Sequence, residues 1–252
     1  MRPLLVLVLL SVPAVAAPRD FPFTWTSRTS EAGQSSLEAW ITPRLVRTDD
    51  YVRIDTRAVW TKGVTRTVEA QLSMDMDFEG TTLTRVFDPR VTSLWRWTTW
   101  RQDTPFAVGG LARLSLGLGQ FEVEGRLFAD WQLDRVLMAL NVSASRSLLW
   151  DGREGVDTRL EESFAAKYRV SPTASFGLEI RAKSAWMLRE YQGTAIYVGP
   201  AMTFTNPAFW VTVGGYAQVA ADKANADRSL AEPNELRDNE RFVLRLVFGF
   251  NT

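Results

Sequence analysis

A strict alternation of apolar and polar side chains constrains this chain more than any other feature. It is clearest in Gln120–Asp134, where every second residue is apolar or small and most of the others are charged or polar. Successive side chains of a β-strand point to opposite faces, whereas a helix would scatter these charges around its circumference. The stretch therefore predicts a long strand with one apolar face, formed by Phe121, Val123, Gly125, Leu127, Ala129, Trp131 and Leu133.

The same period of two recurs along the chain and predicts about twelve strands of roughly ten residues or more, long enough for a tilted strand to cross a bilayer. Strands of soluble sheets are typically shorter, about five or six residues. Lipid offers no hydrogen-bond partner to a sheet edge, so a membrane sheet must close. The fold class predicted is all-β, a closed antiparallel up-and-down transmembrane β-barrel. The predicted strands are Leu37–Val46, Val52–Trp60, Val68–Met76, Leu94–Trp100, Val108–Leu118, Gln120–Asp134, Val136–Leu148, Leu160–Val170, Ala174–Trp186, Thr194–Phe204, Phe209–Val219 and Glu240–Phe250.

The connections are of two kinds, which supports an outer-membrane barrel. Short turns alternate with longer polar stretches, and such barrels have short periplasmic turns and longer outer loops. With an even strand count both termini then lie on the periplasmic side. Pro43 and Pro200 fall inside predicted strands, where each removes a backbone donor, so a bulge or strand end is expected there. The short turns are 62–65, 134–135, 171–173 and 205–207; the longer stretches are 77–82, 150–157 and 220–239.

The first residues have the three-part pattern of a secretory signal. Arg2 precedes the apolar run Leu4–Val12, and Ala14-Val15-Ala16 supplies small residues at a cleavage site. We therefore expect a cleaved signal peptide at residues 1–16, an N-terminal extension at 17–34 and the barrel at 35–252. The extension contains three aromatic residues and is compatible with a periplasmic extension, a plug or an extra strand. The expected location is the bacterial outer membrane.

Composition excludes several function classes. The chain has no cysteine and no histidine, and its 29 basic residues balance its 29 acidic residues. It therefore lacks thiol chemistry, the commonest general base and a basic surface for nucleic acid. The spacing of Glu122 and Glu124 on one strand face leaves a two-carboxylate mechanism open in principle, but charged inward positions are routine in barrels. No enzymatic activity, cofactor or metal site is predicted.

The polar parity supplies the candidate lumen-lining residues. If the apolar parity contacts lipid, the charged parity faces the interior, where it either lines a narrow pore or pairs across strands and fills the lumen. A barrel of about twelve strands is intermediate between small filled barrels and open porins, so strand number does not decide between these. The candidates are Arg53, Asp55, Arg57, Glu69, Gln71, Asp75, Glu122, Glu124, Arg126, Asp130, Glu161, Lys167, Glu179, Arg181, Lys183, Arg241 and Arg245.

Aromatic residues recur where predicted strands end. Amphipathic rings favour the headgroup level of a membrane, so aromatic residues at both rims form the girdles of outer-membrane barrels. The predicted girdle on the periplasmic side is Trp60, Trp100, Trp131, Tyr168, Phe204 and Phe250, and that on the outer side is Tyr51, Trp150 and Trp186.

Two predicted hairpins carry a family resemblance. Tyr51–Asp75, with the turn Gly63-Val64-Thr65, resembles hairpins of uncharacterised bacterial outer-membrane barrels and of transporter-like barrels linked to breakdown of aromatic compounds. The segment Tyr168–Glu179 is similar to a second hairpin of that type. The resemblance covers about a quarter of the chain, and Arg66-Thr67 replaces the usual acidic-basic pair after the first turn. It implies an outer-membrane location and a barrel fold, without a substrate or a catalytic residue.

The leading functional hypothesis is a narrow channel or transporter-like barrel for small polar or amphipathic solutes. One alternative is a structural or surface-binding barrel with a filled lumen; another is a soluble periplasmic lipocalin-like carrier whose apolar parity faces inward. The expected partners are outer-membrane lipid and the barrel assembly machinery, whose recognition pattern of alternating apolar residues and a near-terminal aromatic occurs in Glu240–Phe250. No nucleic-acid partner is expected.

Overall fold

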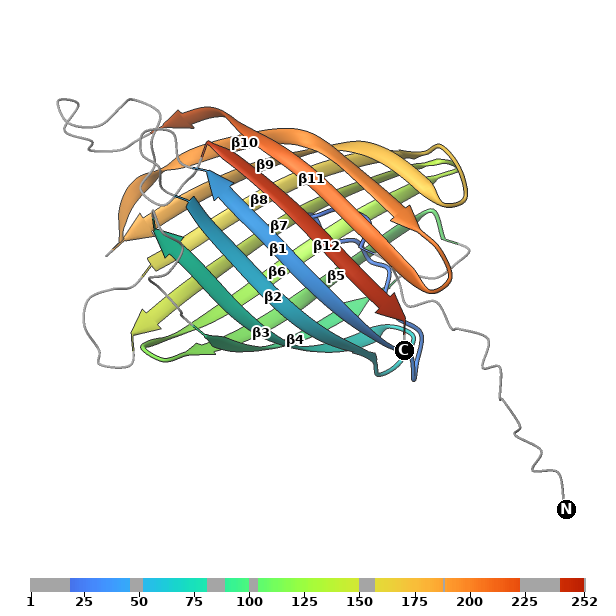
Figure 1. The fold of residues 1–252 in the computed structure, drawn as a ribbon, viewed down its shortest axis with the longest axis horizontal. Helices are drawn as coiled ribbons and strands as arrows, with labels where there is room; N and C mark the ends of the chain where they lie inside the picture. The colour runs from blue at the N-terminus through green and yellow to red at the C-terminus, as the bar shows by residue number, and fades with distance from the viewer. Residues whose placement is uncertain are drawn as a thin grey trace, which may run out of the picture.

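The computed structural model describes residues 19–45, 52–80, 89–99, 104–149, 157–187, 189–222 and 241–251. These residues form twelve antiparallel strands in a closed barrel, in which each strand pairs with its neighbours in sequence and β12 pairs with β1 (Figure 1). This confirms the predicted fold class. The strands are β1 Ser35–Leu45, β2 Val52–Gly63, β3 Val68–Gly80, β4 Arg90–Thr98, β5 Phe106–Gly117, β6 Gln120–Leu133, β7 Val136–Leu149, β8 Asp157–Arg169, β9 Ala174–Met187, β10 Glu190–Thr205, β11 Phe209–Asp222 and β12 Phe242–Asn251.

The barrel has two unlike ends. At the turn end, short connections at 64–67, 134–135, 170–173 and 206–208 join strands. β1 begins and β12 ends at the same end of the barrel. At the opposite end, called the loop end, residues 46–51, 81–88, 150–156 and 223–240 connect strands and lie outside the described residues, as do the predicted signal peptide and most of the predicted loop 220–239. Within the described ranges, no helix is long and apolar enough to cross a membrane.

The apolar parity faces outward along the strands. On β12, Phe242 and Leu244 are about half exposed, whereas Val243 is 6% and Val247 0% exposed. On β6, Leu127 is 67% exposed and Phe128 only 4%. The alternation therefore separates an apolar outer surface, as lipid contact requires, from an interior packed with both polar and apolar side chains.

Both prolines inside strands interrupt the hydrogen-bond ladder on one side only. The β1–β12 pairs stop at Ile41 and resume at Arg44 in the same register, so Pro43 leaves a gap but ends neither strand. The β10–β11 pairs are likewise missing at Pro200, and a register shift lies between Ile196 and Tyr197. A bulge accompanies the second proline only.

Several strand boundaries differ from the prediction. β4 runs from Arg90 to Thr98 rather than over Leu94–Trp100, because Trp95 and Trp97 face outward while the apolar Leu94 faces inward and hides the alternation. β3 continues through Gly80, so the connection expected at 77–82 begins later. β10 begins at Glu190, just after Arg189, whose φ of 71° makes a tight turn at the loop end.

Residues 19–30 lie inside the barrel, and residues 31–34 follow at the rim of its turn end (Figure 1). Of the alternatives left open for the extension, the plug is the arrangement observed. We call residues 19–30 the plug; its aromatic side chains Phe21, Phe23 and Trp25 are 1–8% exposed. Trp25 forms one buried apolar cluster with inward-facing side chains of the wall, which were not predicted to line the interior: Trp40, Val59, Leu94, Leu111, Phe128, Trp210 and Val247.

Two glycines make room for inward-facing aromatic rings. Trp210 lies directly over its cross-strand partner Gly249, where a Cβ atom would come within 2.1 Å of the indole. Phe128 covers Gly109 in the same way, at 2.3 Å. Only glycine at these positions permits such close ring packing across neighbouring strands.

Candidate functional site: a plugged lumen

Side chains of the barrel wall bind the backbone of the plug. The amide group of Asn141 on β7 accepts from the N–H of Trp25 and donates to its carbonyl oxygen, both at 2.8 Å. Glu179 on β9 accepts from the N–H and the hydroxyl of Thr24, each at 2.5 Å, and from the hydroxyl of Tyr216. Because the plug pairs with no strand along 19–30, these side chains satisfy backbone groups that would otherwise be buried without partners.

The same arrangement continues toward the C-terminal part of the plug. Asp130 on β6 accepts from the N–H of Ser27 at 2.8 Å, and Glu69 on β3 accepts from the N–H of Ser30 at 2.9 Å. Arg96 neutralises Glu69 through an ion pair of 2.7 Å. Carboxylates expected only to line a lumen therefore hold the plug in place.

Charged groups hold the first residues of the plug. Arg19 pairs with Glu38 at 3.2 Å, and Asp20 pairs with Lys167 at 2.6 Å and with Arg28 at 3.4 Å. Burial alone would raise the pKa of the Asp20 carboxyl, but the charges of Lys167 and Arg28 outweigh burial and hold this pKa at about 2. Asp20 is therefore ionised at every physiological pH.

Guanidinium groups stack on the aromatic rings of the plug. The guanidinium carbons of Arg181 and Arg245 lie 3.4 and 3.6 Å from the centroid of Phe23. Two groups this close to one centroid must occupy opposite ring faces, so Phe23 lies between them. Arg19 covers Trp25 at 3.6 Å. These cation–π contacts add to the hydrogen bonds that hold the plug.

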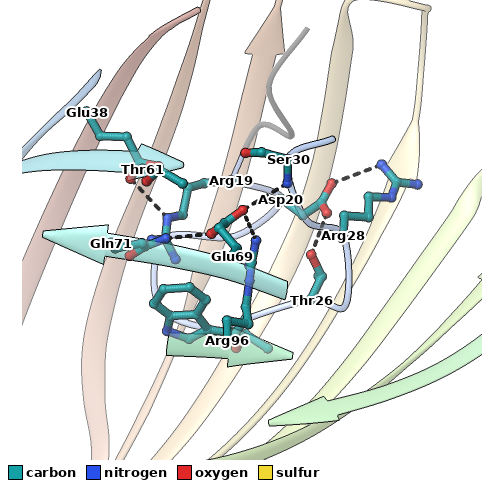
Figure 2. A pocket seen from close by; sticks show the side chains of 12 residues that line it. Arg19, Asp20, Thr26, Arg28, Ser30, Glu38, Thr61, Glu69, Gln71 and Arg96 are labelled. Atoms are coloured by element: carbon teal, nitrogen blue, oxygen red, sulfur yellow. Dashed lines mark hydrogen bonds and ion pairs between the residues drawn. The ribbon is translucent and has the colours of Figure 1, made fainter. Parts of the chain in front are cut away.

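Figure 2 shows the contact between the plug and the wall formed by β1–β4, where Glu69 lies between Arg96, Gln71 and the backbone of Ser30. A cavity of about 20 Å³ remains there. This is room for about one water molecule. At this level the plug fills the lumen.

Two larger cavities lie on either side of the plug. The loop-end vestibule has a volume of about 360 Å³ and has Phe23, Trp25 and Trp40 among its lining residues. The turn-end vestibule has a volume of about 150 Å³ and reaches Asp20 and Arg28 from the other side. The plug therefore separates two water-sized or larger spaces within one barrel.

Ion pairs tie the strands together around the loop-end vestibule. Arg57 donates two hydrogen bonds to Asp75, at 2.6 and 3.0 Å, across β2 and β3. Arg113 binds both Glu122 and Glu124, the latter at 2.7 Å. A guanidinium thus occupies the carboxylate pair that was considered for acid–base chemistry, which argues against that use.

The predicted lumen residues lie in three places, with Arg241 apart from all of them. Glu69, Gln71, Asp130 and Glu179 contact the plug, and Lys167 lies beside the turn-end vestibule. Arg241 immediately precedes β12 at the loop end and is absent from the linings of both vestibules. Around the loop-end vestibule lie Arg53, Asp55, Arg57, Asp75, Glu122, Glu124, Arg126, Glu161, Arg181, Lys183 and Arg245.

The predicted aromatic girdle falls partly within the described residues. Trp60, Tyr168, Phe204 and Phe250 are 43–53% exposed near the turn end, and Trp131 lies there against Phe106 with ring centroids 5.2 Å apart. Trp186 contacts Tyr191 near the loop end. Tyr51, Trp100 and Trp150 lie outside the described residues. The exposed Trp95 and Trp97 were not predicted as part of the girdle.

Carboxylates in the described part of the chain form no group of three or more that could hold a metal ion. Asp77, for example, pairs with Arg53 at 3.0 Å and with Arg90. Guanidinium groups therefore take the place that a cation would have at these carboxylates.

Comparison with known proteins places the fold among outer-membrane channels. A profile of a family of unknown function, DUF6662, matches residues 141–252. No curated protein sequence matches. The COG4313 outer membrane channel from Pseudomonas putida F1 is similar in structure, with a TM-score of 0.61, 9% identity, and coverage of 94% of this chain and 100% of that one.

Two porins are similar as well. The NanC porin has a TM-score of 0.58 and 11% identity, and the KdgM porin, solved in complex with disordered oligogalacturonate, has a TM-score of 0.55 and 8% identity. Each alignment covers 85% of this chain and 98% of the porin. At such low identity the likeness establishes a shared barrel fold.

Proposed function

We propose that the protein is an outer-membrane channel for small solutes and that its own N-terminal segment closes the lumen in the state described. The plug between two vestibules is the observation that carries the proposal. Without residues 19–30, the loop-end and turn-end vestibules would join through the space that Phe21, Phe23 and Trp25 now fill.

The way the plug is held supports a removable closure. Its backbone is bound by side chains of the wall and by no continuous β-ladder over 19–30, so it can leave without breaking the barrel's own strand pairing. The wall behind it carries polar groups such as Asn141, Asp130 and Glu179, which water can solvate once the plug is gone.

The outward apolar parity supports a membrane location and disfavours a soluble carrier, whose apolar parity would have to face an internal core. Expression in a Gram-negative host, followed by membrane fractionation and comparison of boiled with unboiled samples, tests the location. Recovery in the outer membrane with a boiling-dependent shift of gel mobility is expected. Recovery as a soluble periplasmic protein would refute this part of the proposal. The link to breakdown of aromatic compounds stays a prediction of the family resemblance.

Conductance in planar bilayers tests the closure. The full chain should show little current, and a variant lacking residues 19–30 but retaining the preceding residues should show steady conductance. The full-length variant Glu179→Ala, which loses both bonds to Thr24, should give intermediate openings. Heat-modifiable mobility of each variant serves as the control for a closed barrel.

A structural barrel with a permanently filled lumen is the second candidate, and the many buried contacts of the plug favour it. The same experiment separates the two functions. If the deletion variant folds as a heat-modifiable barrel yet conducts no more than the full chain, the channel proposal fails and the structural role is supported.

A further inference from the structure

We infer that the loop-end vestibule binds small carboxylate-bearing solutes and that the guanidinium of Arg245 contacts the carboxylate. The inference rests on the proposed channel function, whose class of solute it names. It is drawn from the partners of Arg245, the charges around the vestibule and the fixed position of the guanidinium.

Arg245 differs from the arginines around it in its partners. Its Nε donates to the hydroxyl of Thr42 at 2.9 Å and its Nη1 donates to the carbonyl oxygen of Pro22 at 3.3 Å. Within the described ranges, no carboxylate forms an ion pair with Arg245, and its Nη2 has no hydrogen-bond partner. Because Arg245 lines the loop-end vestibule, its Nη2 group is available to a solute in that space.

The carboxylate of Asp55 on β2 is already shared between other arginines. Asp55 lies across the β1–β2 ladder from Thr42, and it binds Arg44 at 2.5 Å and Arg53 at 2.7 Å. The single negative charge of Asp55 is therefore already shared between the guanidinium groups of Arg44 and Arg53. An incoming carboxylate would supply the charge that the wall lacks.

The charge distribution along the lumen supports an anion. The whole chain carries 29 basic and 29 acidic residues, but the loop-end vestibule is lined by ten basic and seven acidic side chains. The turn-end vestibule is lined by four basic side chains and one acidic side chain. The small cavity beside the plug is balanced, with three of each. Both vestibules therefore attract anions from the solution on their side.

Aromatic rings fix the guanidinium of Arg245. It stacks on Phe23 at 3.6 Å and lies 5.3 Å from the ring centroid of Trp40. A planar fork held in place in this way loses little freedom on binding, and it matches the geometry of a carboxylate. The vestibule volume of about 360 Å³ lies within the range typical of small-molecule sites, roughly 300–1,000 Å³.

Calorimetric titration of the purified full chain in detergent tests the inference, with glucuronate as the anionic probe and glucose as its neutral counterpart. Glucuronate should bind saturably and glucose should not. Arg245→Gln should weaken glucuronate binding about tenfold or more, as expected for loss of a charge-assisted hydrogen bond. Arg146→Gln, the same change on an exposed residue outside the vestibule lining, is the matched control and should bind as the unmodified chain does.

Asp55→Asn keeps the test decisive if Arg245→Gln fails to fold. Removing this negative charge leaves Arg245 intact and makes its surroundings more positive, so glucuronate should bind several-fold more tightly. Arg159→Gln removes a positive charge of the same vestibule that is already paired with Asp157, and it should weaken binding less than Arg245→Gln does.

Three results would overturn the inference: equal binding of glucose and glucuronate, an unchanged affinity in Arg245→Gln, or an Asp55→Asn variant that binds no more tightly. A loss in Arg159→Gln as large as that in Arg245→Gln would also overturn it, since it would show diffuse attraction without a site. Conductance separates this inference from the channel proposal. A plug-deleted barrel that conducts, together with a full chain that binds glucose and glucuronate equally, would leave the channel standing and refute the site. Saturable glucuronate binding by the full chain, together with a plug-deleted barrel that does not conduct, would refute the channel and leave the site standing.

Discussion

Asn141 offers the sharpest test of how firmly the plug is held. Its side-chain amide makes two hydrogen bonds of 2.8 Å to the backbone of Trp25, and both partners are buried. Asn141→Ala removes both bonds and leaves one N–H and one carbonyl group of the plug without a partner. The substitution does not touch the strand pairing of β7, so its effect falls on the plug.

The size of the effect follows from the two orphaned groups. A buried backbone group that loses its partner costs about 1–3 kcal/mol, so the pair costs about 2–6 kcal/mol. Water entering the space left by the amide brings the loss toward the lower end of this range. A loss of about 2 kcal/mol already raises the population of displaced plug about 30-fold.

A single introduced cysteine reports on that population, because the chain has none of its own. Ser27 is fully buried in the plug, so Ser27→Cys should react slowly with a charged thiol reagent, and adding Asn141→Ala should speed the reaction about 30-fold or more. Asn206→Ala is the matched control, because the side chain of Asn206 accepts only from the N–H groups of Ala208 and Phe209 at the turn end, and the change should leave the rate unchanged. Equal rates with and without Asn141 would show that this amide does not hold the plug, and the reasoning above would fail.

Three further predictions concern the wall, the outer surface and acid. Gly249→Val forces a side chain into the overlying indole and should abolish heat-modifiable mobility on gels, whereas Gly125→Ala, with nothing within 4 Å of its Cβ position, should preserve it. Leu127→Arg, on the outer face midway along β6, should lower the free energy of unfolding in liposomes by about 2–4 kcal/mol, and Leu118→Arg, in the loop-end turn, by less than about 1 kcal/mol. Because the pKa of Asp20 is lowered to about 2, its stabilising charge is fully present above its ordinary pKa and is lost only as pH falls toward 2. The contribution of Asp20 should therefore stay constant from pH 7 to pH 4, so the ratio of the bilayer currents of Asp20→Asn and the full chain should not change over this range; a ratio that falls toward one near pH 5 would contradict this.

The strands were predictable because their signal is local. In β6 and β12 each residue's parity identifies its face, and a strand of ten or more residues repeats this information several times. The prediction weakened where an inward position is apolar, as at Leu94 in β4. There the side chain packs in the plugged interior, and its apolar character cancels the alternation.

The plug was not predictable to the same degree because its partners are remote. Nothing near Thr24 in the sequence indicates that its N–H binds Glu179, 155 positions away. The sequence showed polar residues on the inner parity of the wall but not which of them face the plug rather than a vestibule. The aromatic residues of the extension were the available signal, because Phe21, Phe23 and Trp25 are costly to leave in water.

The plug precedes the barrel strands in the chain, and this order determines at which stage of assembly the wall can bind it. Arg19, Asp20 and Pro22 accept hydrogen bonds through their carbonyl oxygens from Thr212, Thr203 and Arg245, which belong to the last three strands. The plug precedes every strand of the barrel, yet these partners lie on the last three strands, and contacts at such sequence distance form slowly. We therefore expect the barrel wall to close first and the plug to enter a newly assembled, open barrel afterwards.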